Sequence, residues 1–352
     1  MKTIKIKSPL TDKKEAGKLC QAGADELFCG IEPYGWKRNY RNFAINQRVG
    51  SANFSKMRDL EEAVNTAHRY GVKVHVAVNA FFYMEEQYSK AIDLIKDILD
   101  IGADGIIFAD IGLLLNIDKK LFRGKDIVIG TDAVVFNSQA VDFYSSFGAS
   151  RIVFPRAMTL DEIRDVTEKA KNLEYEVFII HDLCFFVDGF CTYCKEASGQ
   201  IEKSKDINKD IRFFSSSRPL IRGYAGGCRT RFSCQRILTA NEKHAKIMKD
   251  FRFWDKKHIQ GCGACAVYDF KKIGITSLKV LDRNLPTEEK IKATKFIKEL
   301  LDILDKNDSS REEFIENAQK LFRRTFRTRC SRYDCYYPSV LKLRNGKGNT
   351  HN

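Results

Sequence analysis

Short apolar runs alternate with longer amphipathic stretches from the first residues of the chain to about residue 180. The apolar runs have the length of strands, and the stretches between them carry the 3.6-residue period of helices. This alternation is typical of βα units that build a parallel sheet. We expect strands at residues 3–6, 26–29, 72–78, 105–108, 127–130, 151–154 and 176–180, and helices at residues 12–22, 57–70, 86–101, 138–147 and 160–172.

An eighth apolar run lies at residues 276–281 and is followed by an amphipathic stretch at residues 287–304. Eight strands with this alternation predict a closed (β/α)8 barrel of the TIM type. An open doubly wound sheet stays as the alternative, because periodicity alone does not show closure. The predicted division is βα repeats 1–7 at residues 1–183, a cysteine-rich metal-binding insertion at 184–270, the last βα unit at 271–305, and a basic helical tail at 306–352.

Most of the eleven cysteines lie in the predicted insertion. Thiolates gathered after a core strand are what an iron-sulfur cluster or a zinc ion needs. A disulfide framework is the weaker explanation, because a chain of 352 residues buries a large core without cross-links. The cysteines of the insertion are Cys184, Cys191, Cys194, Cys228, Cys234, Cys262 and Cys265.

The remaining four cysteines have separate interpretations. Cys20 and Cys29 fall on an expected helix and an expected strand, and are most simply core residues. Cys330 and Cys335 lie in the predicted tail, where a second metal site, ligands that complete the first site and buried thiols all stay open.

No secretion signal opens the chain and no run of eighteen apolar residues occurs in it. We therefore expect a cytoplasmic protein in a reducing compartment, without a membrane partner. The net charge of +14 favours a phosphate-bearing partner such as RNA, with solvated basic faces as the alternative. Basic clusters lie at residues 37–38, 229–236 and 323–329, and we expect Arg229, Arg231 and Arg236 to contact RNA phosphates.

Polar residues follow many of the expected strands. A charged group that ends an apolar strand is costly to bury without a role, although each residue alone suits a helix cap or an ion pair. Because the carboxyl ends of barrel strands share one face, we expect the set to form a pocket there. Its members are Asn79, Asp110, Thr131, Asp132, Arg156, His181, Asp182, Lys279, Asp282 and Arg283.

Residues 176–191 carry a motif with Glu176, Phe178, Leu183, Cys184, Gly189 and Cys191 in register. This motif resembles the signature of the collagenase-like peptidase family (peptidase family U32). The likeness extends over most of residues 5–285, as at residues 52–55, 110–112 and 274–279. The chain departs from the family pattern at Ala157, where a glutamate is usual, and at Asp282, where the acidic residue comes one position late.

The resemblance implies a [4Fe-4S] cluster and oxygen-independent hydroxylation of a tRNA uridine, an rRNA cytidine or a ubiquinone precursor, with prephenate as oxygen source in some branches. It implies Cys184, Cys191, Cys228 and Cys262 as ligands, with Cys265 as an alternative to Cys262. Zinc is the alternative metal, because Cys191 and Cys194, and Cys262 and Cys265, form CxxC pairs. The predicted catalytic residues are Asn79, Asp110, Asp132, Arg156 and Lys279.

Within this interpretation a prephenate-like anionic co-substrate pairs with Arg156 and Lys279. Two other functions stay open. The first is a collagenase-like peptidase, as the family name states, which would need a nucleophile such as Cys194. The second is a metal-stabilised module that binds nucleic acid and catalyses no reaction. A protein partner or a homo-oligomer is compatible with each of the three.

Overall fold

Eight parallel strands close into a barrel in sequence order, with β8 hydrogen-bonded to β1. The computed structural model describes residues 3–40, 45–48, 50–170, 173–184, 187–190, 261–306, 310–328, 330 and 334–341. The predicted (β/α)8 barrel is confirmed, and the open sheet is wrong. The strands are β1 (Lys5–Pro9), β2 (Glu26–Gly30), β3 (Lys73–Val78), β4 (Gly105–Phe108), β5 (Asp126–Ile129), β6 (Arg151–Val153), β7 (Glu174–Ile180) and β8 (Ser277–Val280).

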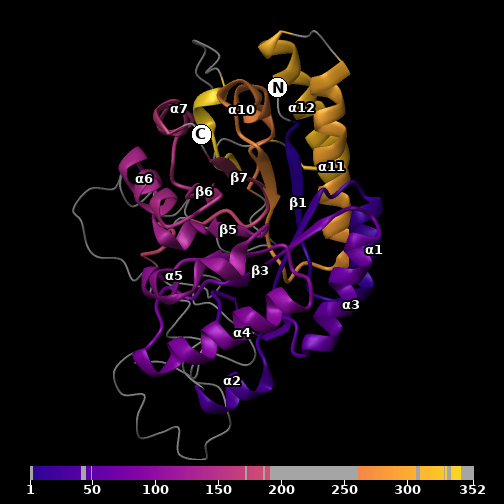
Figure 1. Ribbon diagram of the computed structural model, residues 1–352. Helices are drawn as coiled ribbons and strands as arrows, with labels where there is room; N and C mark the ends of the chain where they lie inside the picture. The colour runs from indigo at the N-terminus through magenta and orange to yellow at the C-terminus, as the bar shows by residue number, and fades with distance from the viewer. Residues whose placement is uncertain are drawn as a thin grey trace, which may run out of the picture.

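Helices follow the strands and surround the barrel (Figure 1). They are α1 (Lys13–Gln21), α2 (Tyr34–Asn39), α3 (Met57–His68), α4 (Tyr88–Asp100), α5 (Ile111–Asn116), α6 (Ser138–Ser146), α7 (Leu160–Lys169), α10 (Val267–Ile273), α11 (Thr287–Lys306) and α12 (Arg311–Phe326). Short 3₁₀ helices occur at Gly50–Ala52, Glu85–Gln87, Lys119–Phe122, Thr131–Ala133, Ala264–Ala266 and Pro338–Val340. Within the described ranges every helix is too short or too polar to cross a lipid bilayer.

Local sequence explains where the longer helices begin. Thr159 caps α7 by accepting a hydrogen bond from the Glu162 amide, and the Glu162 side chain accepts one from the Thr159 amide in return. Asp12 and Glu15 form the same reciprocal cap at α1. Such capping boxes satisfy amides that would otherwise lack partners in the first turn. The apolar face that follows each cap then packs on the barrel.

The first strand lies further along the chain than predicted. Residues 3–6 were expected, but β1 runs from Lys5 to Pro9 and buries Lys7 and Ser8 completely. These polar residues concealed the strand, because burial of a lysine is costly unless charged partners compensate. The helices α2, α5 and α10 were not predicted, and each is too short to show a helical period.

Ion pairs fill the middle of the barrel, where apolar layers are usual. Glu176 on β7 is fully buried, and its carboxylate pairs with the Lys7 amine at 3.0 Å and the Lys279 amine at 2.8 Å. Arg151 adds a contact at 3.1 Å to the same carboxylate and also binds Glu26. These contacts join five strands across the interior, β1, β2, β6, β7 and β8, and fix the base of the cavity above them.

The C-terminal part of the described chain returns to the barrel. The helices α11 and α12 pack together on one flank, with α11 also against α1 (Figure 1). A final segment then reaches the end of β7, where residues 334–336 pair with Cys262. The predicted insertion lies between β7 and β8, and its residues 191–260 lie outside the described ranges, so the predicted domain boundaries stay a prediction.

Candidate active site

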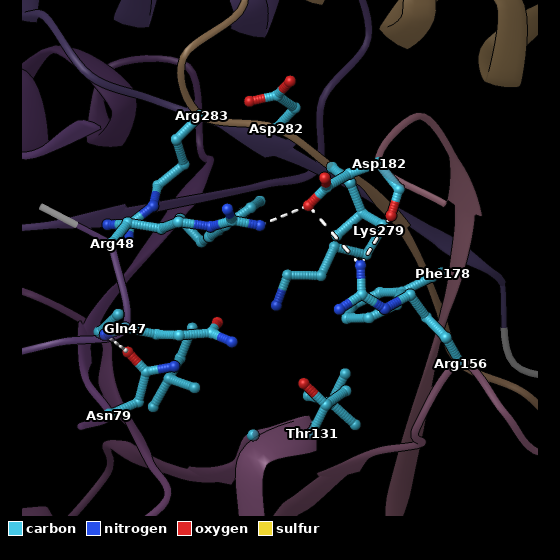
Figure 2. Close-up of a pocket in the computed structure, with 16 residues that line it drawn as sticks. Gln47, Arg48, Asn79, Thr131, Arg156, Phe178, Asp182, Lys279, Asp282 and Arg283 are labelled. Atoms are coloured by element: carbon cyan, nitrogen blue, oxygen red, sulfur yellow. Dashed lines mark hydrogen bonds and ion pairs between the residues drawn. The ribbon is translucent and has the colours of Figure 1, made fainter. Parts of the chain in front are cut away.

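A cavity of about 70 Å³ opens at the carboxyl end of the barrel strands. Polar residues that follow different strands converge there, as the sequence predicted, together with two residues of a loop before α3 (Figure 2). The lining consists of Phe28, Gln47, Arg48, Ala77, Asn79, Ile107, Gly130, Thr131, Val153, Arg156, Phe178, Asp182, Lys279, Leu281, Asp282 and Arg283.

Asp132 lies just behind this lining and carries the most altered carboxyl of the site. Its two oxygens accept hydrogen bonds from the Gln47 amide group at 3.0 Å and the Asn79 amide group at 3.3 Å. Burial, and then repulsion by Asp188, raise the pKa of Asp132 to about 7. A carboxyl with such a pKa can both give and take a proton near neutral pH, which is the property of a general acid or base.

Arg156 follows β6 and is held by the protein's own carboxylates. Asp188 accepts a hydrogen bond from the Arg156 backbone at 2.9 Å and another from its Nε at 3.1 Å. A further bond of 2.6 Å runs from the guanidinium to the Asp182 carbonyl. Burial alone would lower the pKa of Arg156, but Asp188 and Asp182 raise it well above its usual value. The charge expected to bind a co-substrate is therefore already neutralised.

Lys279 is engaged in a similar way. Its amine pairs with Glu176 at 2.8 Å and lies over the ring of Phe28, 4.3 Å from the ring centroid. Figure 2 shows the amine pointing into the cavity from β8. Both residues predicted to pair with an anion thus line the cavity as expected, but each already has a carboxylate partner.

Arg283 is the exception among the cations of the lining. It is 6% exposed, and its guanidinium donates to the side-chain oxygens of Asn53 and Asn46, both at 3.0 Å. Among the described residues no carboxylate lies within ion-pair distance of it. Burial, and then repulsion by Arg48, lower the pKa of Arg283 to about 10. A buried cation held only by neutral amides is a strong candidate for binding an anion.

Gly30 leaves room for this guanidinium. A Cβ atom at Gly30 would lie 2.1 Å from Arg283 Nη1 and 2.3 Å from Asn53 Oδ1. We expect Gly30→Ala to displace the Arg283 side chain, with a stability loss of about 1–3 kcal/mol from overpacking. A crystal structure of the variant would check the displacement. An alanine accommodated with Arg283 unmoved would contradict this account, and Gly35→Ala, where the added Cβ meets nothing within 4 Å, is the matched control.

Asp110 does not line the cavity, although it was predicted to be catalytic. Its carboxylate caps α5 through the Leu113 amide at 2.6 Å and accepts from the Tyr83 amide at 3.1 Å. These bonds give Asp110 a structural task, and a catalytic role stays a prediction. His181 is likewise absent from the lining, and its backbone adopts a left-handed φ of 69° just after β7.

Sequence reasoning missed Gln47, Arg48 and Asp188. Gln47 and Arg48 lie in a loop that does not directly follow a strand. A search for polar residues at strand ends therefore does not find them. Asp188 had a usable signal, since it directly precedes Gly189 of the cysteine motif. Figure 2 shows Asp182 between Arg48 and Arg156, and it bonds to both.

Only part of the predicted cluster set falls within the described residues. Cys184 is half-buried and lies just after β7, two residues beyond Asp182 of the cavity lining. Cys262 is buried, and its backbone forms a parallel bridge with that of Cys335 in the tail. Predicted residues outside the described ranges are Cys191, Cys194, Cys228, Cys234, Arg229, Arg231 and Arg236.

No three His, Cys, Asp or Glu side chains among the described residues are grouped so that they could hold a metal ion. Burial raises the pKa of Cys265 to about 12 and that of Cys335 to about 11. The cluster and its alternative, zinc, therefore stay predictions. Cys184 follows Asp182 of the cavity lining by two residues, whereas Cys262 lies beside Cys335 of the tail.

Three curated proteins are similar to this chain. A tRNA hydroxylation protein P1 of Bacillus subtilis is 30% identical over 169 residues, which cover 48% of this chain and 36% of that protein. A 23S rRNA 5-hydroxycytidine synthase of Escherichia coli is 27% identical over 210 residues, covering 59% and 29%. A collagenase of Porphyromonas gingivalis is 25% identical over 202 residues, covering 53% and 44%.

This chain thus spans less than half the length of each of these relatives. The sequence profile of Peptidase family U32 matches residues 11–334, which include strands β2 to β8, every residue that lines the cavity and four of the five described cysteines that follow β7. The chain belongs to Peptidase family U32.

Proposed function

We propose that this protein is an enzyme that hydroxylates a pyrimidine base of RNA with the help of a small anionic co-substrate bound at Arg283. The observation that carries the proposal is the buried Arg283 guanidinium at the cavity wall, whose hydrogen-bond partners are two neutral amides. The relatives named for tRNA and rRNA hydroxylation support the reaction class.

The size of the cavity favours a small acid over a nucleoside inside it. A volume of about 70 Å³ accommodates a few water molecules or one carboxylate-bearing group. Arg283 would bind the carboxylate through paired N–H donors, with Asn79 and Thr131 on the opposite wall to orient the rest. Asp132, with its pKa near 7, would hold or release a proton one hydrogen bond behind that wall.

An RNA base would then approach from the rim of the cavity. Tyr34 follows β2 and is 75% exposed, and Phe190 follows β7 and is 72% exposed. Because both come after the carboxyl ends of strands, they belong to the face on which the cavity opens. Exposed aromatic rings on a basic protein are suited to stack unpaired bases. Arg229, Arg231 and Arg236 are proposed to bind the phosphates, as the sequence suggests.

A [4Fe-4S] cluster is part of the proposal. Cys184 would hold it beside Arg156, together with Cys191 and Cys228 from the family motif. When bound, such a cluster supplies electron-transfer chemistry at the cavity mouth. The residues described above would bind the co-substrate, hold the proton and position the base.

The test is nucleoside mass spectrometry of RNA from an Escherichia coli strain that lacks its own tRNA and rRNA hydroxylation proteins and expresses this chain. We expect a pyrimidine nucleoside heavier by one oxygen. Arg283→Ala should reduce its amount by about 10- to 100-fold, because charged hydrogen bonds contribute about 1.5–3 kcal/mol. Arg58→Ala removes an exposed arginine of α3, outside the basic clusters, and should leave the yield unchanged.

The peptidase alternative is supported by the relative named a collagenase. It predicts cleavage of peptides by the purified chain and no change in RNA. Cleavage without a hydroxylated nucleoside would overturn the proposed function, as would a full yield from Arg283→Ala.

A further inference from the structure

We propose that the outer face of α2 binds the single-stranded RNA substrate, with one base stacked on Tyr34 and phosphates held by Lys37 and Arg38. The proposal rests on the proposed function and assigns to one helix the contacts that hold the RNA strand beside the cavity. Three exposed side chains carry it, on a helix whose connection to α3 also supplies the partners of Arg283. We call these three side chains the α2 surface.

The helical period places the three side chains together. Tyr34, Lys37 and Arg38 occupy positions i, i+3 and i+4 of α2, which are neighbours on the surface of a helix. All three are exposed, and Tyr34 is the most exposed large apolar side chain of the described residues. Trp36 lies on the opposite side of the helix and is buried. The helix thus directs one ring inward and presents a second ring with two positive charges outward.

The two cations of the α2 surface are available to a partner. Among the residues that the structure describes, no carboxylate pairs with Lys37 or Arg38, and the Arg38 Nε donates only to the Asn39 side-chain oxygen at 3.4 Å. Such cations can neutralise phosphates and release the counterions of a nucleic acid. An exposed ring beside them suits a stacked base. An acidic protein would use the two charges without needing the ring, so the combination favours RNA.

Packing around Trp36 fixes the position of α2. The Trp36 ring centroid lies 4.8 Å from that of Tyr40 and 6.1 Å from that of Tyr83, which it meets edge-on. The Tyr83 hydroxyl donates to the Ile45 carbonyl at 2.5 Å, so the same tyrosine also holds the loop that follows the helix. A surface that is ordered before its ligand arrives loses little conformational entropy on binding.

The loop after α2 leads directly to the anion site. Asn46 follows Ile45 in the chain and accepts a hydrogen bond from Arg283. Asn53 holds the same guanidinium, and Gln47 lines the cavity. Figure 1 shows α2 at the end of the barrel opposite the N-terminus, which is the end where the cavity opens. A strand bound on the α2 surface would therefore pass beside the cavity with a neighbouring base near its rim.

The first test is fluorescence anisotropy of a labelled oligouridine of about 12 nucleotides with the full chain. We expect Tyr34→Ala to weaken binding by about 5- to 100-fold, the usual effect of losing one base stacked on an aromatic side chain. Tyr34→Phe keeps the ring and should bind as the wild type does. Tyr34→Leu is apolar without being aromatic and should bind as weakly as the alanine variant.

The second test is the salt dependence of the same binding. The double variant Lys37→Ala, Arg38→Ala removes two expected phosphate contacts. Each contact to a single strand contributes about 0.7 to the slope of the logarithm of affinity against the logarithm of salt concentration. We therefore expect the slope to become shallower by about 1.4, with a loss of affinity that is greatest at low salt.

The other end of the barrel offers a matched control surface. Tyr70 lies between α3 and the start of β3 and is 49% exposed, and Lys18 and Arg69 are exposed basic residues of the same region. A Cβ atom at Gly17, next to Lys18, would lie 3.7 Å from the Tyr70 ring. Tyr70→Ala, and Lys18→Ala combined with Arg69→Ala, should leave both affinity and salt slope unchanged.

The outcomes separate this surface from the proposed reaction. Wild-type affinity in Tyr34→Ala, or equal losses in the α2 and control variants, would overturn the proposal. Complete displacement of the RNA by polyglutamate at equal charge would overturn it as well, because charge alone would then explain binding. A hydroxylated nucleoside made by a chain whose α2 variants bind RNA normally counts against the α2 surface alone. Loss of affinity in Tyr34→Ala without any hydroxylated nucleoside supports the surface and counts against the proposed function.

Discussion

Replacing Glu176 by glutamine is expected to lower the free energy of unfolding at pH 7 by about 3–5 kcal/mol, the usual result of removing one partner from a buried ion pair. The change keeps the shape of the side chain and removes the charge that the Lys7 and Lys279 amines share. Arg151 would retain Glu26, but the two lysines would lose their contact at 3.0 Å and 2.8 Å to a carboxylate. Urea unfolding of wild type and variant measures the difference.

Glu289→Gln is the matched control for this experiment. Glu289 pairs with Lys292 on the surface of α11, where both side chains are partly exposed. Exposed pairs contribute about 0–1 kcal/mol, so this variant should unfold almost as the wild type does. An equal effect of the two substitutions would show that the pairs inside the barrel do not stabilise it as inferred.

Replacing Asp132 by asparagine is expected to change how stability depends on pH. The pKa of Asp132 is about 7 in the folded protein, whereas an aspartate exposed to water has a pKa of 3.8. At pH values between 3.8 and about 7 the folded state therefore keeps a proton that the unfolded chain has released. Ionisation of the buried group therefore costs stability progressively as pH rises from about 4 to about 7, in total on the order of 4 kcal/mol. The asparagine cannot ionise and avoids this loss.

The measurement is the free energy of unfolding of both proteins at several pH values across this interval. The difference between them should be smallest near pH 4 and largest above pH 7, in favour of the variant. Asp142→Asn, at an exposed position of α6, should run parallel to the wild type. A constant difference across the interval would mean that Asp132 is ionised throughout.

The sequence was sufficient for the barrel because its strands are buried on both faces and read as apolar runs, each followed by turn residues. Recognition of strands as apolar runs failed where charged side chains are buried inside the barrel. Lys7 is polar in the sequence and buried in the protein because Glu176 lies opposite, and a single sequence does not reveal that pairing. The start of β1 was misplaced for the same reason.

The candidate site was predictable in outline and not in detail. Strand-end residues converge as expected, because the parallel topology brings their ends to one face. The sequence could not show that Arg156 is neutralised by Asp188 or that Arg283 is not paired with a described carboxylate. Such pairings depend on contacts between residues distant in the chain. The sequence therefore predicted Arg156 and Lys279 as the anion site, whereas the site proposed above is Arg283.

Closure of the barrel has a consequence for synthesis of the chain. Lys5 of β1 pairs with Ser277 of β8, so the first strand to be synthesised cannot form this pairing until the last strand of the barrel has been made. Until residues 277–280 leave the ribosome, β1 and β7 are the open edges of a seven-stranded sheet. Open edges can pair with other chains, and long-range pairing is slow to form. The nascent protein is therefore expected to depend on chaperones until β8 is inserted, and truncations before residue 277 should aggregate.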